Sequence, residues 1–117
     1  MGRAVYAMGE NKFDAALETL HSVVVIAPDY TEGWNKRATV YFLMARYEES
    51  IADLERTLSL EPRHFGAFSG LRLVYSHLED NTNALDAYAR ALKVNPHIGQ
   101  AKTEVKRLHR EVKGKKI

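Results

Sequence analysis

The sequence predicts an all-α fold built from stacked helical hairpins. Prolines recur every 34 residues, at Pro28, Pro62 and Pro96, and several apolar or small positions recur at the same step. These columns are Ala16/Ser50/Ala84, Leu17/Ile51/Leu85, Leu20/Leu54/Tyr88, Val23/Thr57/Ala91 and Ile26/Leu60/Val94. A fixed period of this length indicates copies of one supersecondary unit that bury a core when they stack.

Two apolar faces in each copy predict two helices. In the second copy, Trp34, Ala38 and Tyr41 lie three or four residues apart, and Leu54 and Leu58 repeat that spacing later. Such spacing places each set on one helical face. The prolines fall between copies because proline cannot continue a helix. We therefore expect seven helices, at 3–9, 13–26, 31–44, 47–60, 65–78, 81–94 and 98–113.

The last of these segments has the pattern of a capping helix. The face that packs on the preceding hairpin is apolar and carries Ala101, Val105 and Leu108. The face that a following helix would cover is polar, because it carries Lys102 and Lys106. A terminal repeat needs such a polar outer face for solubility.

The first copy is predicted to be incomplete. The column of Trp34 and Phe68 would fall one residue before Met1, so we expect the chain to begin inside its first helix. Tyr6 lies in a column that packs on a preceding hairpin. The favoured interpretation is a fragment of a longer protein, and the alternative is self-association through this N-terminal face.

The residue sizes in the copies match a known repeat. The second copy reads Trp34-x-x-Arg37-Ala38-x-x-Tyr41, Ser50-x-x-x-Leu54, Pro62, and the third reads Phe68-x-x-Leu71-Arg72-x-x-Tyr75, Ala84-x-x-x-Tyr88, Pro96. This pattern resembles the tetratricopeptide repeat (TPR) over about residues 1–96. The resemblance implies a right-handed α-α solenoid, in which 1–117 form a single TPR domain. Its parts would be repeats at about 1–30, 31–64 and 65–98, a capping helix at 99–113 and a basic tail at 114–117.

No residue set predicts catalysis, a metal site or a cofactor, and we expect a non-enzymatic protein without a small-molecule substrate. The five histidines form no His-x-x-x-His pair on a helix. The chain has no cysteine, which excludes disulfides and thiol catalysis. Its content of 45% hydrophobic and 27% charged residues is typical of a soluble globular domain.

The sequence gives little information on cellular location. It contains no run of about 18 apolar residues that would span a membrane. No signal-peptide pattern opens the chain. A cytoplasmic location is slightly favoured, and an exported or organellar one stays open if an N-terminal segment is missing.

The resemblance also predicts a binding surface for a protein partner. In TPR proteins the first helix of each pair lines a concave groove. Residues of that helix that do not pack against neighbouring helices should therefore face the groove. The predicted groove residues are Asn35, Lys36, Thr39, Phe42, Ser69, Leu73, Arg107 and Arg110. Apolar positions flanked by polar donors and cations suit an extended peptide or a partner helix. For Phe42, packing against neighbouring helices is the alternative.

One known TPR binding mode is not predicted here. A subset of the family holds the C-terminal carboxylate of heat-shock chaperones with a Lys/Asn, Asn, Lys/Arg set. The corresponding positions in this chain are Met1, Val5, Lys36, Gly66 and Gly70. The resemblance therefore implies that this carboxylate clamp is absent.

The basic C-terminal segment suggests a different function. The net charge of the chain is +2, yet residues 99–117 alone carry seven Lys or Arg against two Glu. Clustered cations attract phosphates, so binding of nucleic acid or another anionic surface is an alternative. No aromatic residue lies in that segment for base stacking. A third possibility is a self-associating structural fragment of a longer TPR array.

Overall fold

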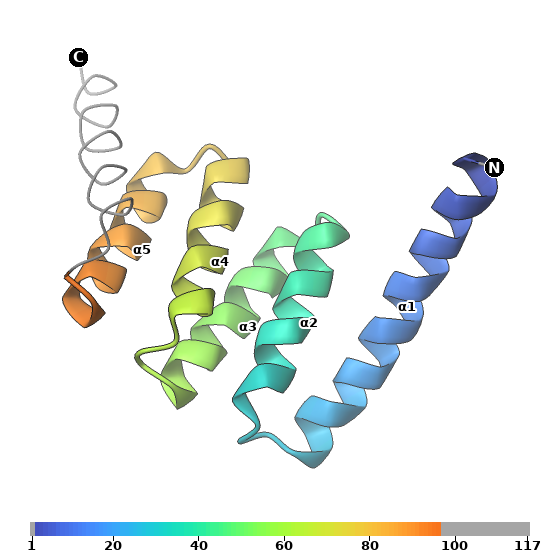
Figure 1. Ribbon diagram of the computed structural model, residues 1–117, viewed down its shortest axis with the longest axis horizontal. Coiled ribbons are helices and arrows are strands. Elements are labelled where there is room, and N and C mark those ends of the chain that lie inside the picture. Colours follow the sequence, from blue (N-terminus) through green and yellow to red (C-terminus); the bar gives the residue numbers. More distant parts are fainter. Residues whose placement is uncertain (1, 97–117) are drawn as a thin grey trace. The chain divides into compact units, whose positions relative to one another are not determined.

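The computed structural model describes residues 2–96, with side chains from residue 12 onward, and this part of the chain contains five helices and no strand. The helices are α1 (Gly2–Ile26), α2 (Thr31–Leu43), α3 (Tyr47–Leu60), α4 (Phe65–His77) and α5 (Asn81–Val94) (Figure 1). The predicted all-α fold is confirmed. The expected capping helix at 98–113 and the basic tail lie outside the described residues. The chain divides into two compact units, with the boundary between Leu60 and Glu61.

Helices α2 to α5 begin where the sequence pattern predicts and end within one residue of the expected positions. Side-chain caps explain two of the starts. The Nδ1 atom of His64 accepts a hydrogen bond from the Ala67 backbone N–H at 3.0 Å, at the start of α4. Asp80 Oδ1 accepts one from the Asn83 N–H at 3.2 Å, at the start of α5. Each cap satisfies an N–H that has no partner within the helix.

The same three-residue turn closes both described hairpins. Ala45 and Glu79, which are 34 residues apart, adopt left-handed backbone conformations with φ of 59° and 57°. The next residue then donates its backbone N–H to a carbonyl five positions earlier: Arg46 to Tyr41, and Asp80 to Tyr75, both at 2.8 Å. This arrangement is a Schellman motif, which satisfies the last carbonyls of a helix. The 34-residue sequence repeat is therefore accompanied by the same backbone conformation at the turn of both hairpins.

The prediction of two helices at 3–9 and 13–26 is wrong, because α1 continues without a break from Gly2 to Ile26. Counted by 34, Asn11 occupies the column of Ala45 and Glu79. A non-glycine residue in the left-handed conformation costs free energy. At Ala45 and Glu79 this cost is offset because the turn allows two helices to pack against each other. The segment from Gly2 to Glu10 contains no proline, so the helix can continue through Asn11 and satisfy its backbone hydrogen bonds.

The first unit consists of α1, α2 and α3. Ala38 and Tyr41 on α2 are buried, and so are Leu54 and Leu58 on α3. α1 packs against α2 through its buried Leu17 and Val24. Gly33 permits this approach, because a Cβ atom at that position would lie 2.9 Å from Val23 Cγ1.

The second unit contains the α4–α5 hairpin. Its buried residues are Ala67, Phe68, Leu71 and Val74 from α4 and Ala84, Ala87, Tyr88 and Ala91 from α5. Arg72 occupies the column of Ala38, where the neighbouring copy has a small residue. Its guanidinium lies over the Tyr88 ring, 5.4 Å from the centroid. The long side chain thus covers the hairpin core instead of separating its helices.

Candidate functional site

The predicted groove residues of α2 follow one side of that helix. Lys36 and Thr39 are exposed, whereas Asn35 and Phe42 are half-buried. Thr39 Oγ1 donates a hydrogen bond to the Asn35 carbonyl at 3.2 Å. The Phe42 ring lies 5.8 Å from the Tyr47 ring at the start of α3. Phe42 therefore both packs within its hairpin and keeps part of its surface accessible.

The predicted groove residues of α4 are Ser69 and Leu73, which lie one turn apart. Ser69 is half-buried and lines a small pocket between α4 and α5, together with Phe65 and Tyr88. Leu73 has 43% of its surface exposed. Its sequence neighbours Arg72 and Val74 are more buried, so Leu73 alone among these three points to solvent.

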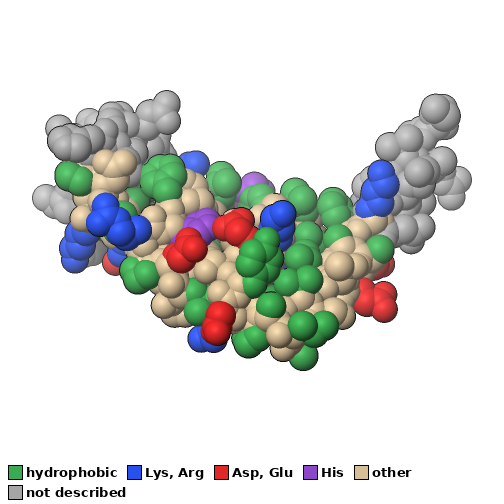
Figure 2. Space-filling model, turned by 60° about the horizontal axis from the view of Figure 1, so that its bottom comes forward, with side chains coloured by type: hydrophobic (Ala, Val, Ile, Leu, Met, Phe, Trp, Pro, Cys, Tyr) green, Lys and Arg blue, Asp and Glu red, His purple; other side chains and the backbone are tan. Residues whose placement is uncertain are grey.

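The remaining groove residues, Arg107 and Arg110, lie outside the described residues. α2 belongs to the first unit and α4 to the second, so each face is described on its own and the joint groove stays a prediction. Figure 2 shows one face of the molecule, where hydrophobic side chains reach the surface among charged ones. The exposed large hydrophobic residues are Val25, Ile26, Tyr30, Leu43, Phe65, Leu73 and Leu78.

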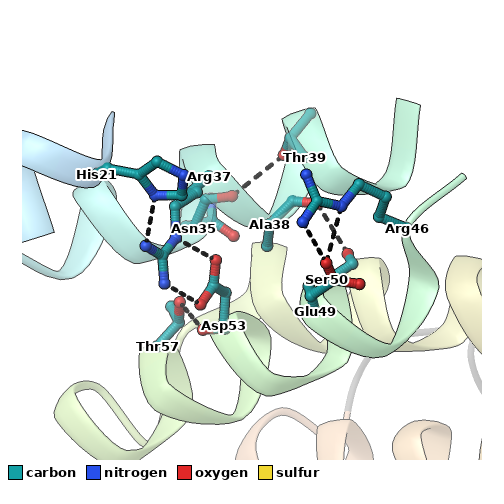
Figure 3. Close-up of polar contacts among 10 residues, drawn as sticks. All are labelled: His21, Asn35, Arg37, Ala38, Thr39, Arg46, Glu49, Ser50, Asp53 and Thr57. Carbon is teal, nitrogen blue, oxygen red and sulfur yellow. Dashed lines mark hydrogen bonds and ion pairs between the residues drawn. The ribbon is translucent and has the colours of Figure 1, made fainter. Parts of the chain in front are cut away.

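A polar cluster around Arg37 was not predicted from the sequence. Arg37 Nε and Nη2 donate hydrogen bonds to both carboxylate oxygens of Asp53, at 2.7 and 2.8 Å. Arg37 Nη1 lies 2.9 Å from Nδ1 of His21 (Figure 3). A guanidinium only donates, so this imidazole nitrogen is the unprotonated acceptor. One side chain of α2 thereby connects α1 with α3.

Aromatic rings surround the same guanidinium. Its carbon atom lies 5.2 Å from the Trp34 ring centroid and 5.5 Å from that of Tyr41. The hydrogen bonds to Asp53 raise the pKa of Arg37 above its ordinary value, against the opposing effect of burial. Each side-chain nitrogen of Arg37 has a partner in this arrangement. The cluster holds three helices together.

The sequence of these helices matches a known family of proteins. A family model described as "Tetratricopeptide repeat" matches residues 31–64. A TPR repeat-containing protein of Rhizobium etli is 38% identical over 108 residues, which are 92% of this chain and 53% of that protein. The chain belongs to the tetratricopeptide repeat family. It spans about half the length of the Rhizobium protein.

Solved TPR structures share the fold. The crystal structure of MamA superposes with a TM-score of 0.77 at 23% identity, over 92% of this chain and 62% of that one. The first TPR domain of human RNA polymerase II-associated protein 3 gives 0.75 at 18% identity, over 98% and 91%. The first TPR of Spaghetti, solved with the HSP90 peptide SRMEEVD, gives 0.74 at 18% identity, over 95% and 88%. At these identities the likeness shows the all-α repeat fold alone. TPR proteins in general are non-enzymatic scaffolds that mediate protein–protein interactions.

Comparison of the two complete TPR repeats reveals a signal for the Arg37 cluster. Counted by 34, Arg37 corresponds to Leu71, and Asp53 corresponds to Ala87. Leu71 and Ala87 are fully buried. At the two positions where the third repeat has this buried apolar pair, the second repeat has a cation and an anion. Opposite charges that appear together at buried columns predict an ion pair.

Two further features concern the described residues, 2–96. Among these described residues, no group of three His, Asp or Glu side chains lies close enough together to hold a metal ion. In the same part of the chain, no helix has the length and apolar character needed to cross a membrane.

Proposed function

We propose that this TPR chain is a non-enzymatic interaction module that binds a segment of a partner protein along the outward faces of α2 and α4. The observation that carries the proposal is Leu73, a large apolar side chain with 43% of its surface exposed on a helix whose Leu71 and Val74 are buried. Exposed apolar side chains of this kind act as anchors when a partner covers them.

The chemistry of the α2 face supports a peptide ligand. Lys36 carries a positive charge at the surface, and the hydroxyl and amide groups of Thr39 and Asn35 lie on the same side. Phe42 adds a partly accessible ring one turn further along the helix. A partner segment with apolar side chains and one acidic group matches this combination, since apolar contacts supply affinity and polar contacts supply direction.

The proposal does not extend to the chaperone-tail mode. The Spaghetti structure contains an HSP90 peptide. Of the clamp positions in this chain, Lys36 alone is a cation, and Gly66 and Gly70 have no side chain to reach a carboxylate. We therefore expect the peptide SRMEEVD to show no saturable binding to this protein in isothermal titration calorimetry. Saturable binding that Lys36→Ala abolishes would contradict this part of the proposal.

The proposed surface is tested by site-specific photo-crosslinking. A benzophenone amino acid placed at Phe42 or at Leu73 should crosslink to the same peptide segment of the natural partner. Matched positions on the second helices, Ser59 of α3 and Lys93 of α5, are also exposed and should give no such product. Equal crosslinking from all four positions would show that binding does not use the α2 and α4 faces.

The crosslinked segment then provides a ligand for affinity measurements. We expect Phe42→Ala and Leu73→Ala each to weaken binding by about 1–3 kcal/mol, as for buried interface anchors. Ser59→Ala is the control. If Phe42→Ala lowers the melting temperature and leaves affinity unchanged, Phe42 serves the hairpin core through its contact with Tyr47. A steep loss of affinity with salt would instead favour phosphate binding by the basic C-terminal segment.

A further inference from the structure

An exposed aromatic side chain marks the base of the α4–α5 hairpin. Phe65 is the first residue of α4, and 50% of its surface is exposed. The start of α4 lies beside the end of α5 (Figure 1), and Phe65 borders an open hollow of about 400 Å³ there. Four further residues line this hollow: Arg63, Val94, Asn95 and Pro96. Its volume lies within the range of ligand sites in proteins.

The packing of a TPR hairpin does not require these side chains. Counted by 34, Phe65 corresponds to Thr31, which is only 8% exposed. A smaller side chain therefore suffices at this column in the second repeat. Arg63 corresponds to Asp29, so the charge beside this column is reversed as well. The aromatic ring and the cation of the third repeat thus need an explanation other than the repeat fold.

Phe65 contacts the hairpin core as well as the hollow. It lines the small pocket between α4 and α5 together with Phe68 and Tyr88, which are both buried. These contacts restrict the Phe65 side chain before any ligand arrives. A restricted ring loses little conformational entropy on binding, so an apolar contact with it contributes more of its energy to affinity.

A positive charge lies beside this apolar surface. Arg63 Nη2 donates a hydrogen bond to the Val94 carbonyl at 3.3 Å, at the end of α5. The partial negative charge of a helix C-terminus favours a cation there. The Arg63 side chain is exposed, and a guanidinium has further N–H groups that can donate to a ligand. Of the described residues that line the hollow, none is acidic.

These features favour a ligand that combines an aromatic side chain with a carboxylate. Aromatic pairs gain energy beyond the burial of their area, and a carboxylate accepts paired hydrogen bonds from a guanidinium. Arg63 is the one cation among the described lining residues, which matches the single charge of a carboxylate better than the double charge of a phosphate. Asn95 occupies the column of Glu61, so the third repeat lacks an acid that would repel this ligand.

We propose that the hollow at the base of the α4–α5 hairpin binds a partner-protein segment in which an aromatic residue adjoins Asp or Glu. The aromatic side chain covers Phe65, and the carboxylate accepts hydrogen bonds from Arg63. This site is separate from the proposed binding along the α2 and α4 faces, because the described residues assigned to those faces do not line the hollow.

Nuclear magnetic resonance with a defined probe tests the proposal. The probe is a capped peptide that contains adjacent phenylalanine and aspartate, titrated into the full isotope-labelled chain. The amide signals of Phe65, Val94 and Asn95 should shift in a saturable manner. A peptide with asparagine in place of the aspartate should bind at least about tenfold more weakly, since it loses the charge-assisted hydrogen bonds.

Two results of this titration would overturn the proposal. One is the absence of saturable shifts at millimolar peptide. The other is a set of shifts confined to Thr39 and Leu73, which would show that the peptide binds the α2 and α4 faces instead. In that case the proposed function would stand although the hollow is not a site.

Variants that copy the second repeat separate recognition from folding. Phe65→Thr and Arg63→Asp introduce the residues that the second repeat has at the same columns, so both should keep the helical content measured by circular dichroism. Each should weaken the probe at least about tenfold. Arg56→Asp makes the same charge change at an exposed position of α3 and should leave affinity unchanged. Equal affinities in all three variants contradict the proposal.

Nuclear Overhauser contacts identify the occupant without any substitution. In the complex, the Phe65 ring should show contacts with the phenylalanine ring of the probe. In the free protein, contacts between Phe65 and residues 97–117 would show that the chain itself fills the hollow. That result would overturn the proposal, as would a complex in which the Phe65 ring has no contact with the probe.

Discussion

At the scale of single residues, Arg37 and Asp53 form a contact that depends on both partners. The side chains are 16% and 5% exposed, so each charge has lost most of its hydration. Two parallel hydrogen bonds compensate this loss, and His21 and two aromatic rings engage the rest of the guanidinium. Removing one partner leaves the other charge buried, whereas removing both leaves none. The penalty for a single substitution therefore exceeds the net value of the pair.

We expect Arg37→Ala to reduce the free energy of unfolding by about 3–5 kcal/mol, because the Asp53 carboxylate stays buried without its partner. The double variant Arg37→Leu with Asp53→Ala reproduces the buried Leu71 and Ala87 of the following repeat. It should be within about 1 kcal/mol of the unchanged protein or more stable. Urea unfolding followed by circular dichroism measures both values. If the double variant is less stable than Arg37→Ala, charge burial is not the cause of the loss.

At the scale of helices, the turns explain which boundaries the sequence predicts. The columns of Ala45 and Glu79 lie between two complete apolar faces, and the structure has turns at both positions. Asn11 occupies the same column, yet α1 continues through it. The 34-residue period predicts where a turn is possible. Whether the turn forms depends on how much surface the two flanking helices bury against each other. The spacing of residues alone does not predict this buried area.

The packing of α1 on α2 makes Gly33 sensitive to substitution. In Gly33→Ala the added methyl group would lie 2.9 Å from Val23 Cγ1, which forces the helices apart. Such overpacking costs about 1–3 kcal/mol, whereas the better helix propensity of alanine returns at most about 1 kcal/mol. We therefore expect a net loss of stability, measured by urea unfolding.

A double-mutant cycle identifies the cause of this loss. Val23→Ala removes the methyl group that Gly33→Ala would meet, so the two substitutions should be coupled by at least about 0.5 kcal/mol. Val25→Ala is the matched control, because Val25 is 78% exposed. Equal coupling with both valines would show that the effect of Gly33→Ala arises from the backbone of α2.

The candidate site was only partly predictable for a related reason. Column counting identifies the residues that hairpin packing leaves out, and Lys36, Thr39 and Leu73 are indeed exposed. It does not show that Phe42 also contacts Tyr47, because this contact depends on the rotation of two rings. It also missed the Arg37 cluster, since columns were compared for size and not for paired charge.

At the scale of the whole molecule, the repeat arrangement makes each hairpin depend on its neighbours. A single hairpin buries one face of each helix, and its other faces need an adjacent hairpin or a cap. At the C-terminal side, Leu85 and Leu92 of α5 are only partly buried against the Ala84 and Tyr88 cluster. The sequence predicts that residues 99–113 cover them with the apolar positions Ala101, Val105 and Leu108.

This capping role predicts the effect of truncation. Deleting residues 99–117 would expose Leu85 and Leu92, and each leucine left uncovered costs up to about 1.5–3 kcal/mol of burial energy. We expect a lower melting temperature and aggregation, measured by differential scanning calorimetry and light scattering. Deleting only the basic tail, 114–117, removes two lysines and no predicted cap residue, and should leave both measurements unchanged. If the longer deletion matches the shorter one in stability and oligomeric state, the segment has no capping role, and its cations are then better explained by binding to an anionic partner.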